Sequence, residues 1–351
     1  MIINAILNKK VFSEKIHLDM FKKILTENLA AKNEKILIVG DKGIGDNIVS
    51  PILTNAYGLA AKELGLNYEV VYQTFKGRGD FADRILIKKM QKLPKRSIII
   101  INISNRIGNL DQLGLSFRKF AKQQEHRFIS SSSLGSISTK LIPLIIESLD
   151  IDYKKTEKNT KKIAEILTKG SRVEVTTKAG TNVTFSIKGV EAKTATGIYK
   201  NPGEGGNLPG SEAYIAPETG TMNGTIVIDG SLRILNETII PRNPVRLTIK
   251  DGIITNINDN DDAKKLNATL MWAHNKAKNP EGIWRIGEFG IGLNKKAKII
   301  GSTIIDEKAH RTAHFAIGSN AWFGGNIKAI IHLDQVIKDP TIKVDGKILK
   351  Y

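Results

Sequence analysis

The chain has 351 residues, of which 41% are hydrophobic, and a formal net charge of +18. It contains no cysteine, so disulfides, thiolate nucleophiles, zinc ribbons and iron–sulfur clusters are excluded, and any metal must be held by His, Asp and Glu. No apolar run approaches the ~18 residues that a membrane helix needs, and residues 1–12 lack the order of a secretory signal. We therefore expect a cytoplasmic protein with no membrane partner and enough residues for two domains.

The first half of the chain alternates between helix and strand patterns. Such a βαβ succession predicts a doubly wound, mostly parallel sheet covered by helices. We place this N-terminal α/β domain at residues 1–170, because Lys169-Gly170 closes its last helix. The expected elements are a helix from Ser13 to about Ala31, a strand at 35–39, a helix over 50–64, a strand at 68–72, a helix over 81–92, a strand at 97–102 and a helix that begins near Asp152.

After residue 170 the hydrophobic period changes to that of strands. Apolar residues alternate with polar ones on both sides of Lys178-Ala-Gly-Thr181, which predicts a hairpin. One helix is expected near residues 261–278. We therefore expect a β-rich α+β catalytic domain over residues 171–351. Its further strands are expected at 225–228, 245–249 and 252–257.

A glycine-rich loop, Gly40 to Asn47, follows the first predicted strand and precedes a helix. This is the context of a nucleotide-binding loop, because a helix N-terminus favours phosphate. Its spacing, G-x-x-G-x-G, matches neither the dinucleotide fingerprint nor the Walker A loop. A tight turn from strand to helix is the preferred interpretation, and nucleotide binding is the alternative.

The positive charge is spread along the chain as single residues and pairs, without the interleaved aromatic residues of a stacking platform. A nucleic-acid partner is therefore not expected on this pattern. One stretch differs, because residues 201–232 contain no Lys or Arg but include four acidic residues. In so basic a chain, this gap indicates a site for cations near Glu212.

His332 and Asp334 lie two apart in an apolar run near the C-terminus. Side chains two apart on a strand share a face, so an imidazole and a carboxylate can converge on one metal ion. Further metal-ligand residue types stand upstream in apolar or glycine-rich settings, namely Glu212, Glu288, Glu307 and His314. Together they predict a metal centre in the second domain.

At these residues the chain resembles the leucyl aminopeptidase family of the aminopeptidase S and T type. The segments that carry the resemblance are Asn207–Glu212, Gly287-Glu288, Asp306–Gly318 and His332–Asp334. The resemblance implies an α/β N-terminal domain, a β-rich catalytic domain, a homodimer and two divalent ions, either Zn, Co or Mn. The ligands that it implies are Glu212, Glu288, Glu307, His314, His332 and Asp334.

The resemblance further implies an aminopeptidase that releases N-terminal residues from peptides with a free N-terminus. Two ions would lower the pKa of a shared water to ~7 and polarise the scissile carbonyl. Glu288 is the expected proton shuttle, with Glu212 as the second choice. Ala321 stands where such enzymes carry a tyrosine, and Trp322 or Asn320 could fill that space.

Two other classes of function stay open on the sequence. One is a basic nucleotide- or nucleic-acid-binding protein with a catalytically degenerate hydrolase domain, and the other is a metal-dependent hydrolase of a non-peptide substrate. His310 lies four residues before His314, as in a helical metal pair, but we expect it at the surface near the site. His274, beside Trp272, is expected to be a packing residue.

Overall fold

The computed structural model describes residues 18–114 and 116–351, so the predicted helix start at Ser13 lies outside the described residues. The chain forms two compact units. The first holds the described residues up to Tyr153 together with Gly197–Gly210, and the second holds Lys154–Thr196 and Ser211–Tyr351. The expected boundary at residue 170 differs from this division, because the helix before it packs its apolar residues into the core of the second unit.

The first unit is built on a five-stranded parallel sheet. Its strands are β1 (Ile36–Asp41), β2 (Tyr68–Gln73), β3 (Ile98–Asn102), β4 (Arg127–Ser131) and β8 (Gly205–Asn207), in the order β2-β1-β3-β4-β8. Strands β1 and β3 are buried along their whole length, as central strands covered on both faces should be. The predicted strands at 35–39, 68–72 and 97–102 are therefore confirmed.

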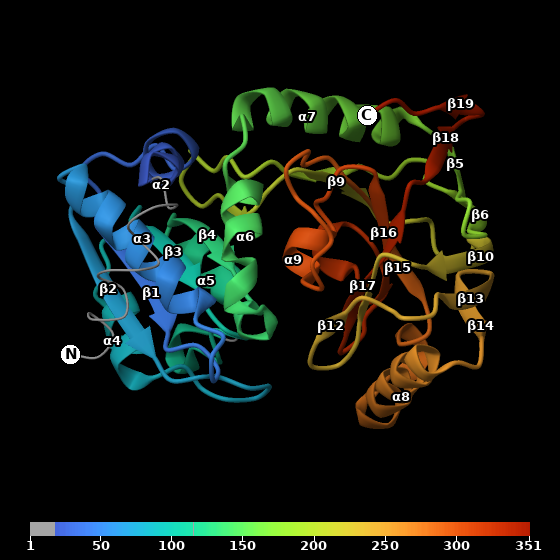
Figure 1. The fold of residues 1–351 in the computed structure, drawn as a ribbon, viewed down its shortest axis with the longest axis horizontal. Coiled ribbons are helices and arrows are strands. Elements are labelled where there is room, and N and C mark those ends of the chain that lie inside the picture. The colour runs from blue at the N-terminus through green and yellow to red at the C-terminus, as the bar shows by residue number, and fades with distance from the viewer. Residues whose placement is uncertain (1–17, 115) are drawn as a thin grey trace. The chain divides into compact units, whose positions relative to one another are not determined.

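Helices cover both faces of this sheet, and α3 (Val49–Glu63) crosses one of them (Figure 1). Tyr57 of this helix packs edge to face on Phe21 of α2, with ring centroids 4.8 Å apart. The other face packs on α4 and α5 through a core that includes Leu86, Met90 and Phe120. The other helical elements are α2 (Leu18–Lys23), the π-helix η1 (Ile24–Asn28), α4 (Arg84–Gln91), α5 (Phe117–Gln123), α6 (Ile142–Leu149) and the short 3-10 turns η2 (Asp111–Leu113), η3 (Leu134–Ser136) and η4 (Thr139–Leu141).

The glycine-rich loop is a tight turn between β1 and α3. Ile44 and Asn47 exchange backbone hydrogen bonds at 3.1 and 3.0 Å, and Gly43 has a φ of 85°, which glycine adopts without strain. The Asp41 carboxylate fills the turn, since it accepts from the backbone N–H of Gly43. These contacts agree with the preferred interpretation of the loop as a turn.

The second unit contains two seven-stranded antiparallel sheets. One has the order β14-β13-β10-β6-β5-β18-β19 and the other the order β12-β11-β17-β16-β15-β9-β7. The first comprises β5 (Arg172–Thr176), β6 (Asn182–Ser186), β10 (Asn223–Ile228), β13 (Val245–Lys250), β14 (Ile253–Ile257), β18 (Thr341–Val344) and β19 (Lys347–Ile348). The second comprises β7 (Lys193–Ala195), β9 (Glu212–Ile215), β11 (Ser231–Arg233), β12 (Thr238–Ile239), β15 (Ile286–Gly292), β16 (Thr312–Gly318) and β17 (His332–Lys338).

The core of this unit lies between the two sheets. Phe185 of β6 meets Phe289 of β15 and Phe315 of β16, with ring centroids 5.2 and 6.3 Å away. The predicted hairpin, the three further strands and the helix near 261–278 are all present. The remaining helical elements are α7 (Tyr153–Lys169), α8 (Asp261–Lys276), α9 (Thr303–Asp306), η5 (Pro280–Gly282) and η6 (Ala321–Phe323).

The expected fold class, an α/β unit followed by a β-rich unit, is thus confirmed. Within the described residues, no helix is both long and apolar enough to cross a membrane.

Candidate metal centre

The acid and histidine residues gather on one face of the second sheet because strand side chains alternate. Phe289 of β15 and Phe315 of β16 point into the core, so their neighbours Glu288 and His314 point to the opposite face. The register of the sheet pairs Ala316 of β16 with Glu288 on one side and with Asp334 of β17 on the other. Three segments far apart in the sequence therefore present their polar side chains to the same surface.

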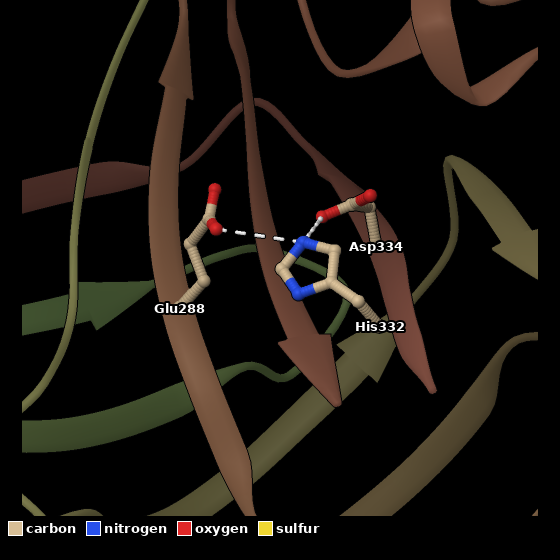
Figure 2. Close-up of side chains that lie close together, drawn as sticks. All are labelled: Glu288, His332 and Asp334. Atoms are coloured by element: carbon tan, nitrogen blue, oxygen red, sulfur yellow. Dashed lines mark ion pairs between the residues drawn. The ribbon is translucent and has the colours of Figure 1, made fainter. Parts of the chain in front are cut away.

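Glu288, His332 and Asp334 form the tightest group of potential ligands. Each offers one atom, and the three atoms lie within 4.8 Å of one another. Figure 2 shows the His332 ring between the two carboxylates, with Nε2 3.2 Å from Asp334 Oδ1 and 3.5 Å from Glu288 Oε2. The predicted sharing of one face by His332 and Asp334 on β17 is confirmed. We call these three residues the triad.

The orientation of His332 suits a metal ligand. Its Nδ1 lies 2.8 Å from the backbone carbonyl oxygen of Ser319, to which it can donate a hydrogen bond. That bond holds the proton on Nδ1 and leaves the lone pair of Nε2 directed at the carboxylates. One imidazole nitrogen and two carboxylate oxygens, mostly buried, are a donor set that fits a divalent transition-metal ion.

His314 and Glu212 extend the group along the sheet. His314 Nε2 lies 3.3 Å from Glu288 Oε1 and 3.7 Å from Glu212 Oε2. His314 is 1% exposed, and its Nδ1 has no hydrogen-bond partner in the part of the chain that the structure describes. The imidazole therefore interacts with the site through one nitrogen alone.

Glu307 and Glu212 share a buried lysine as their partner. Lys308 Nζ lies 2.6 Å from Glu307 Oε1 and also contacts Glu212 Oε1. Sequence reasoning missed Lys308, although the absence of Lys and Arg from residues 201–232 did point to a cation at Glu212. The cation that Glu212 contacts is an ammonium group from a distant turn.

The charges of this cluster shift one another's pKa values. Burial alone would lower the pKa of His332, but Asp334 and Glu288 outweigh it and raise that pKa to about 10. Burial of His314 is likewise outweighed by Glu288 and Glu212, so its pKa rises to about 9. Burial raises the pKa of Glu307 to about 8 despite the opposing effect of Lys308. A divalent cation would relieve the same electrostatic stress that now draws protons to the imidazoles.

Lys308 is a buried group whose pKa is raised, although burial by itself lowers the pKa of a lysine. Desolvation would lower its pKa, but the two adjacent carboxylates, Glu212 and Glu307, raise that pKa well above its usual range. The lysine is therefore an ammonium ion at any working pH.

A glycine on β15 makes room for His314. A Cβ added to Gly290 would lie 2.1 Å from His314 Nε2, so any larger residue would displace the imidazole. Gly292 on the same strand admits the turn that carries Lys308, since its Cβ would lie 2.2 Å from the Ala309 carbonyl oxygen.

The 3-10 turn η6 lies near the triad. It begins at Ala321, the position where aminopeptidases of the S and T type carry a tyrosine. Trp322 is 60% exposed and packs edge to face on His332, with ring centroids 4.6 Å apart. Asn320 is buried, and it ties its loop to β15 by donating to the Gly287 carbonyl at 2.9 Å. Trp322, not Asn320, therefore lies beside the triad.

Two other histidines of the second unit lie outside the centre. The ring of His310 packs against that of Tyr351 at 5.9 Å, in a turn and not on a helix with His314. His274 accepts a hydrogen bond from Trp284 Nε1 at 3.2 Å, so its expected packing role is confirmed, with Trp284 as its partner.

Comparison with known proteins identifies the family. Residues 145–350, more than half of the chain, match the model of the NicX family, described as 2,5-dihydroxypyridine 5,6-dioxygenase. This chain belongs to the NicX family. A curated protein with the name 2,5-dihydroxypyridine 5,6-dioxygenase, from Pseudomonas putida KT2440, is 27% identical over 194 residues. That match covers 52% of this chain and 54% of the relative, so the chain spans about half the length of the relative in this alignment.

Two solved structures share the fold of this NicX-family chain. One is the 2,5-dihydroxypyridine dioxygenase of Pseudomonas putida KT2440, with a TM-score of 0.71, 16% identity, and 94% of each chain covered. The other is AmpT from Thermus thermophilus, with a TM-score of 0.63, 15% identity, and 95% of this chain and 96% of the other covered. These likenesses show the fold.

The expected aminopeptidase is therefore wrong. The family model and the curated relative both point to a dioxygenase, an oxidoreductase and not a hydrolase of peptide bonds. The resemblance to aminopeptidases S and T was correct for the fold, as the AmpT likeness shows, but not for the family. The error has a physical cause, because the same carboxylate and imidazole donors can hold metal ions for hydrolysis or for oxygen chemistry, and one fold hosts both.

Proposed function

We propose that this chain is a metal-dependent dioxygenase that cleaves the ring of a hydroxylated nitrogen heteroaromatic compound of the dihydroxypyridine class. The observation that carries the proposal is the triad of Glu288, His332 and Asp334, placed on one sheet face in a member of the NicX family. The curated relative is named for one substrate of this class, 2,5-dihydroxypyridine. We propose for this chain the dihydroxypyridine class and not that one compound.

The triad residues would hold one divalent ion through His332 Nε2, an Asp334 oxygen and a Glu288 oxygen. The chemistry that such an ion would supply is the activation of O₂, which needs a redox-active metal. Zn²⁺ is not redox-active and so cannot fill this role, whereas Fe²⁺ suits a site of imidazole and carboxylate ligands with open positions. In place of the two Zn, Co or Mn ions that the resemblance implied, we therefore propose a single ion, most simply Fe²⁺.

Trp322 gives the site a feature suited to a planar substrate. Its indole is largely exposed and lies against the His332 ring, so an aromatic substrate can stack on it close to the triad. Such stacking of aromatic rings contributes about 0.5–1.5 kcal/mol. An aromatic platform orients a flat ring, but does little to align an extended peptide.

His314 is the candidate base for the substrate hydroxyl in the metal-loaded site, where a cation bound to Glu288 would offset the negative charge that otherwise raises the pKa of His314. Its Nε2 lies within reach of both Glu288 and Glu212, on the same face as the triad. Removing the hydroxyl proton makes the ring richer in electrons, which favours its reaction with oxygen. Holding that proton at His314 Nε2, between two carboxylates, stabilises the imidazolium that forms.

The direct test is consumption of O₂ with 2,5-dihydroxypyridine after the purified protein has been stripped with a chelator and reloaded. We expect loss of the pyridine absorbance and uptake of one O₂ per ring with Fe²⁺, and no reaction with Zn²⁺ or with the chelated protein. The absence of O₂ uptake across a panel of dihydroxypyridines and dihydroxybenzenes, with iron bound, would contradict the proposal.

The assembly and location of the protein are separate predictions. The homodimer that the resemblance implied remains a prediction, which light scattering of the purified protein tests. The cytoplasmic location likewise remains a prediction, tested by fractionating the cells that produce it.

A further inference from the structure

Lys308 is an unusual residue for the interior of a protein, because lysine is almost never fully buried unless it is paired. Its side chain is 1% exposed, and Nζ contacts one oxygen of Glu212 and one of Glu307, the latter at 2.6 Å. Its partners are also unusual, because Glu212 and Glu307 are both among the predicted metal ligands.

Glu212 connects this ammonium to the triad. One of its oxygens, Oε1, contacts Lys308, and the other, Oε2, lies 3.7 Å from His314 Nε2. The same imidazole nitrogen lies 3.3 Å from Glu288 Oε1. Glu212 therefore lies between the Lys308 ammonium and the His314 imidazole, which in turn lies beside Glu288 of the triad.

The backbone holds Lys308 in place. Its N–H donates to the Ile305 carbonyl at 3.1 Å, and its own carbonyl accepts from Asn294 N–H at 2.8 Å. The turn fits closely against Gly292, whose Cβ would lie 2.8 Å from the Lys308 carbonyl carbon. The ammonium is thus part of the folded chain and does not exchange with solvent as a free ion does.

We propose that the Lys308 ammonium serves as the second cation of this centre, so that the chain binds one divalent ion and not two. The inference rests on the proposed function, in which the triad holds that one ion. A second ion between Glu212 and Glu307 would have to compete with Lys308 for an oxygen of each carboxylate. The second ion would also be repelled by the Lys308 ammonium, which is covalently part of the chain and cannot dissociate from the site.

Metal stoichiometry tests this inference without relying on activity. The wild-type protein and the Lys308→Met variant are dialysed to equilibrium against Mn²⁺ or Co²⁺ and the metal per chain is measured by elemental analysis. Methionine keeps much of the volume of the lysine side chain and removes its charge. We expect one ion per wild-type chain and two per variant chain, with the second ion bound at least about a hundredfold more tightly by the variant.

Two control variants isolate the charge and its place. Lys169→Met removes a surface lysine that pairs with Glu165 at 2.5 Å, and should leave the count at one. Lys308→Arg keeps a cation at the buried position and should also bind one ion.

The possible failures separate the two proposals. Two ions in the wild-type protein, or one ion in a folded Lys308→Met chain, would overturn the role of Lys308 and leave the dioxygenase proposal standing. No bound ion in the wild-type protein would overturn both. If Lys308→Met does not fold, the wild-type count and the Lys308→Arg count still decide, because a second ion in either contradicts the inference.

Discussion

The two units each contain a buried acidic site, and the sites differ in what surrounds the carboxylates. In the first unit, Asp41 accepts from Ser104 N–H at 2.6 Å, from Ser104 Oγ at 2.5 Å and from Gly43 N–H at 3.0 Å. In the second unit, Glu288 contacts imidazole nitrogens of His314 and His332 at 3.3 and 3.5 Å. Backbone N–H and hydroxyl donors satisfy Asp41 permanently, whereas these imidazole partners of Glu288 can change their protonation.

This difference distinguishes a structural carboxylate from a functional one. Asp41 ties the end of β1 to the loop after β3, and its hydrogen bonds need no ligand. The carboxylates of the triad lie beside groups that are themselves ionisable, and ionisable groups with strongly shifted pKa values concentrate at functional sites. Position in the fold alone would have pointed to Asp41 as the ligand-binding carboxylate. Ligands commonly bind at the carboxyl ends of parallel strands, and Asp41 lies at such an end.

Loss of a triad ligand should have the largest effect. We expect His332→Ala to weaken metal binding by at least about a hundredfold and to lower ring cleavage by about a thousandfold or more, since ligand removal disrupts the ion directly. Metal titration and O₂ uptake measure the two effects. A bound ion also stabilises the native state, so a chelator should lower the Tm of the wild-type protein but not of the variant.

The matched control for this prediction is His310→Ala, which removes a histidine that lies near in sequence but outside the centre. It should keep metal and activity. Unchanged metal affinity in His332→Ala would remove His332 from the site.

Removal of Asp41 should affect stability without affecting the metal. Asp41→Ala leaves the buried donors of Ser104 and Gly43 without their acceptor, and we expect the free energy of unfolding to fall by about 3–4 kcal/mol. Chemical denaturation measures the loss, and elemental analysis of the folded protein should still find the wild-type metal content. A loss of metal in a folded Asp41→Ala chain would contradict the separation of the two sites.

The pH dependence of stability offers a third test, through His126 of the first unit. Burial lowers the pKa of His126 to about 4, and neither of its ring nitrogens has a hydrogen-bond partner among the described residues. In the unfolded chain histidine has a pKa of about 6.5. Between pH 6.5 and 4 the unfolded state therefore binds the proton first, so the free energy of unfolding decreases as the pH falls through this range and this contribution levels off below pH 4.

We expect His126 to account for about 2–3 kcal/mol of this decrease. Denaturation of the wild-type protein and of His126→Met at pH 7 and pH 4.5 measures it as the difference between the two pH dependences. Equal pH dependence in the two proteins would show that folding does not shift the pKa of His126.

The smallest expected effect concerns the substrate platform. Trp322→Ala should raise KM for a dihydroxypyridine about fivefold, which corresponds to about 1 kcal/mol of stacking, with little change in kcat. Trp322→Phe keeps an aromatic face and should stay within about twofold of the wild type. Steady-state kinetics at saturating O₂ measure both. A fall in kcat at unchanged KM would place Trp322 in support of His332 instead of the substrate.

Several features followed from the sequence alone, because they depend on local periodicity or on composition. The strands at 35–39, 68–72 and 97–102 and the helices between them follow from runs and spacings of apolar residues. The shared face of His332 and Asp334 follows from the period of two along a strand. The absence of cysteine restricts the metal ligands to carboxylates and imidazoles, whatever the fold.

Other features were decided by the tertiary structure. The sequence predicted six metal ligands but not that Lys308, the residue after Glu307, would bring its ammonium to Glu212, since contacts between segments far apart in the chain depend on how these segments pack. The assignment of α7 and of Gly197–Gly210 to their units likewise depends on packing between distant segments. Local pattern thus determined which residues can carry the chemistry, and long-range packing decided that Lys308 lies among them, because charges interact through space and not along the chain.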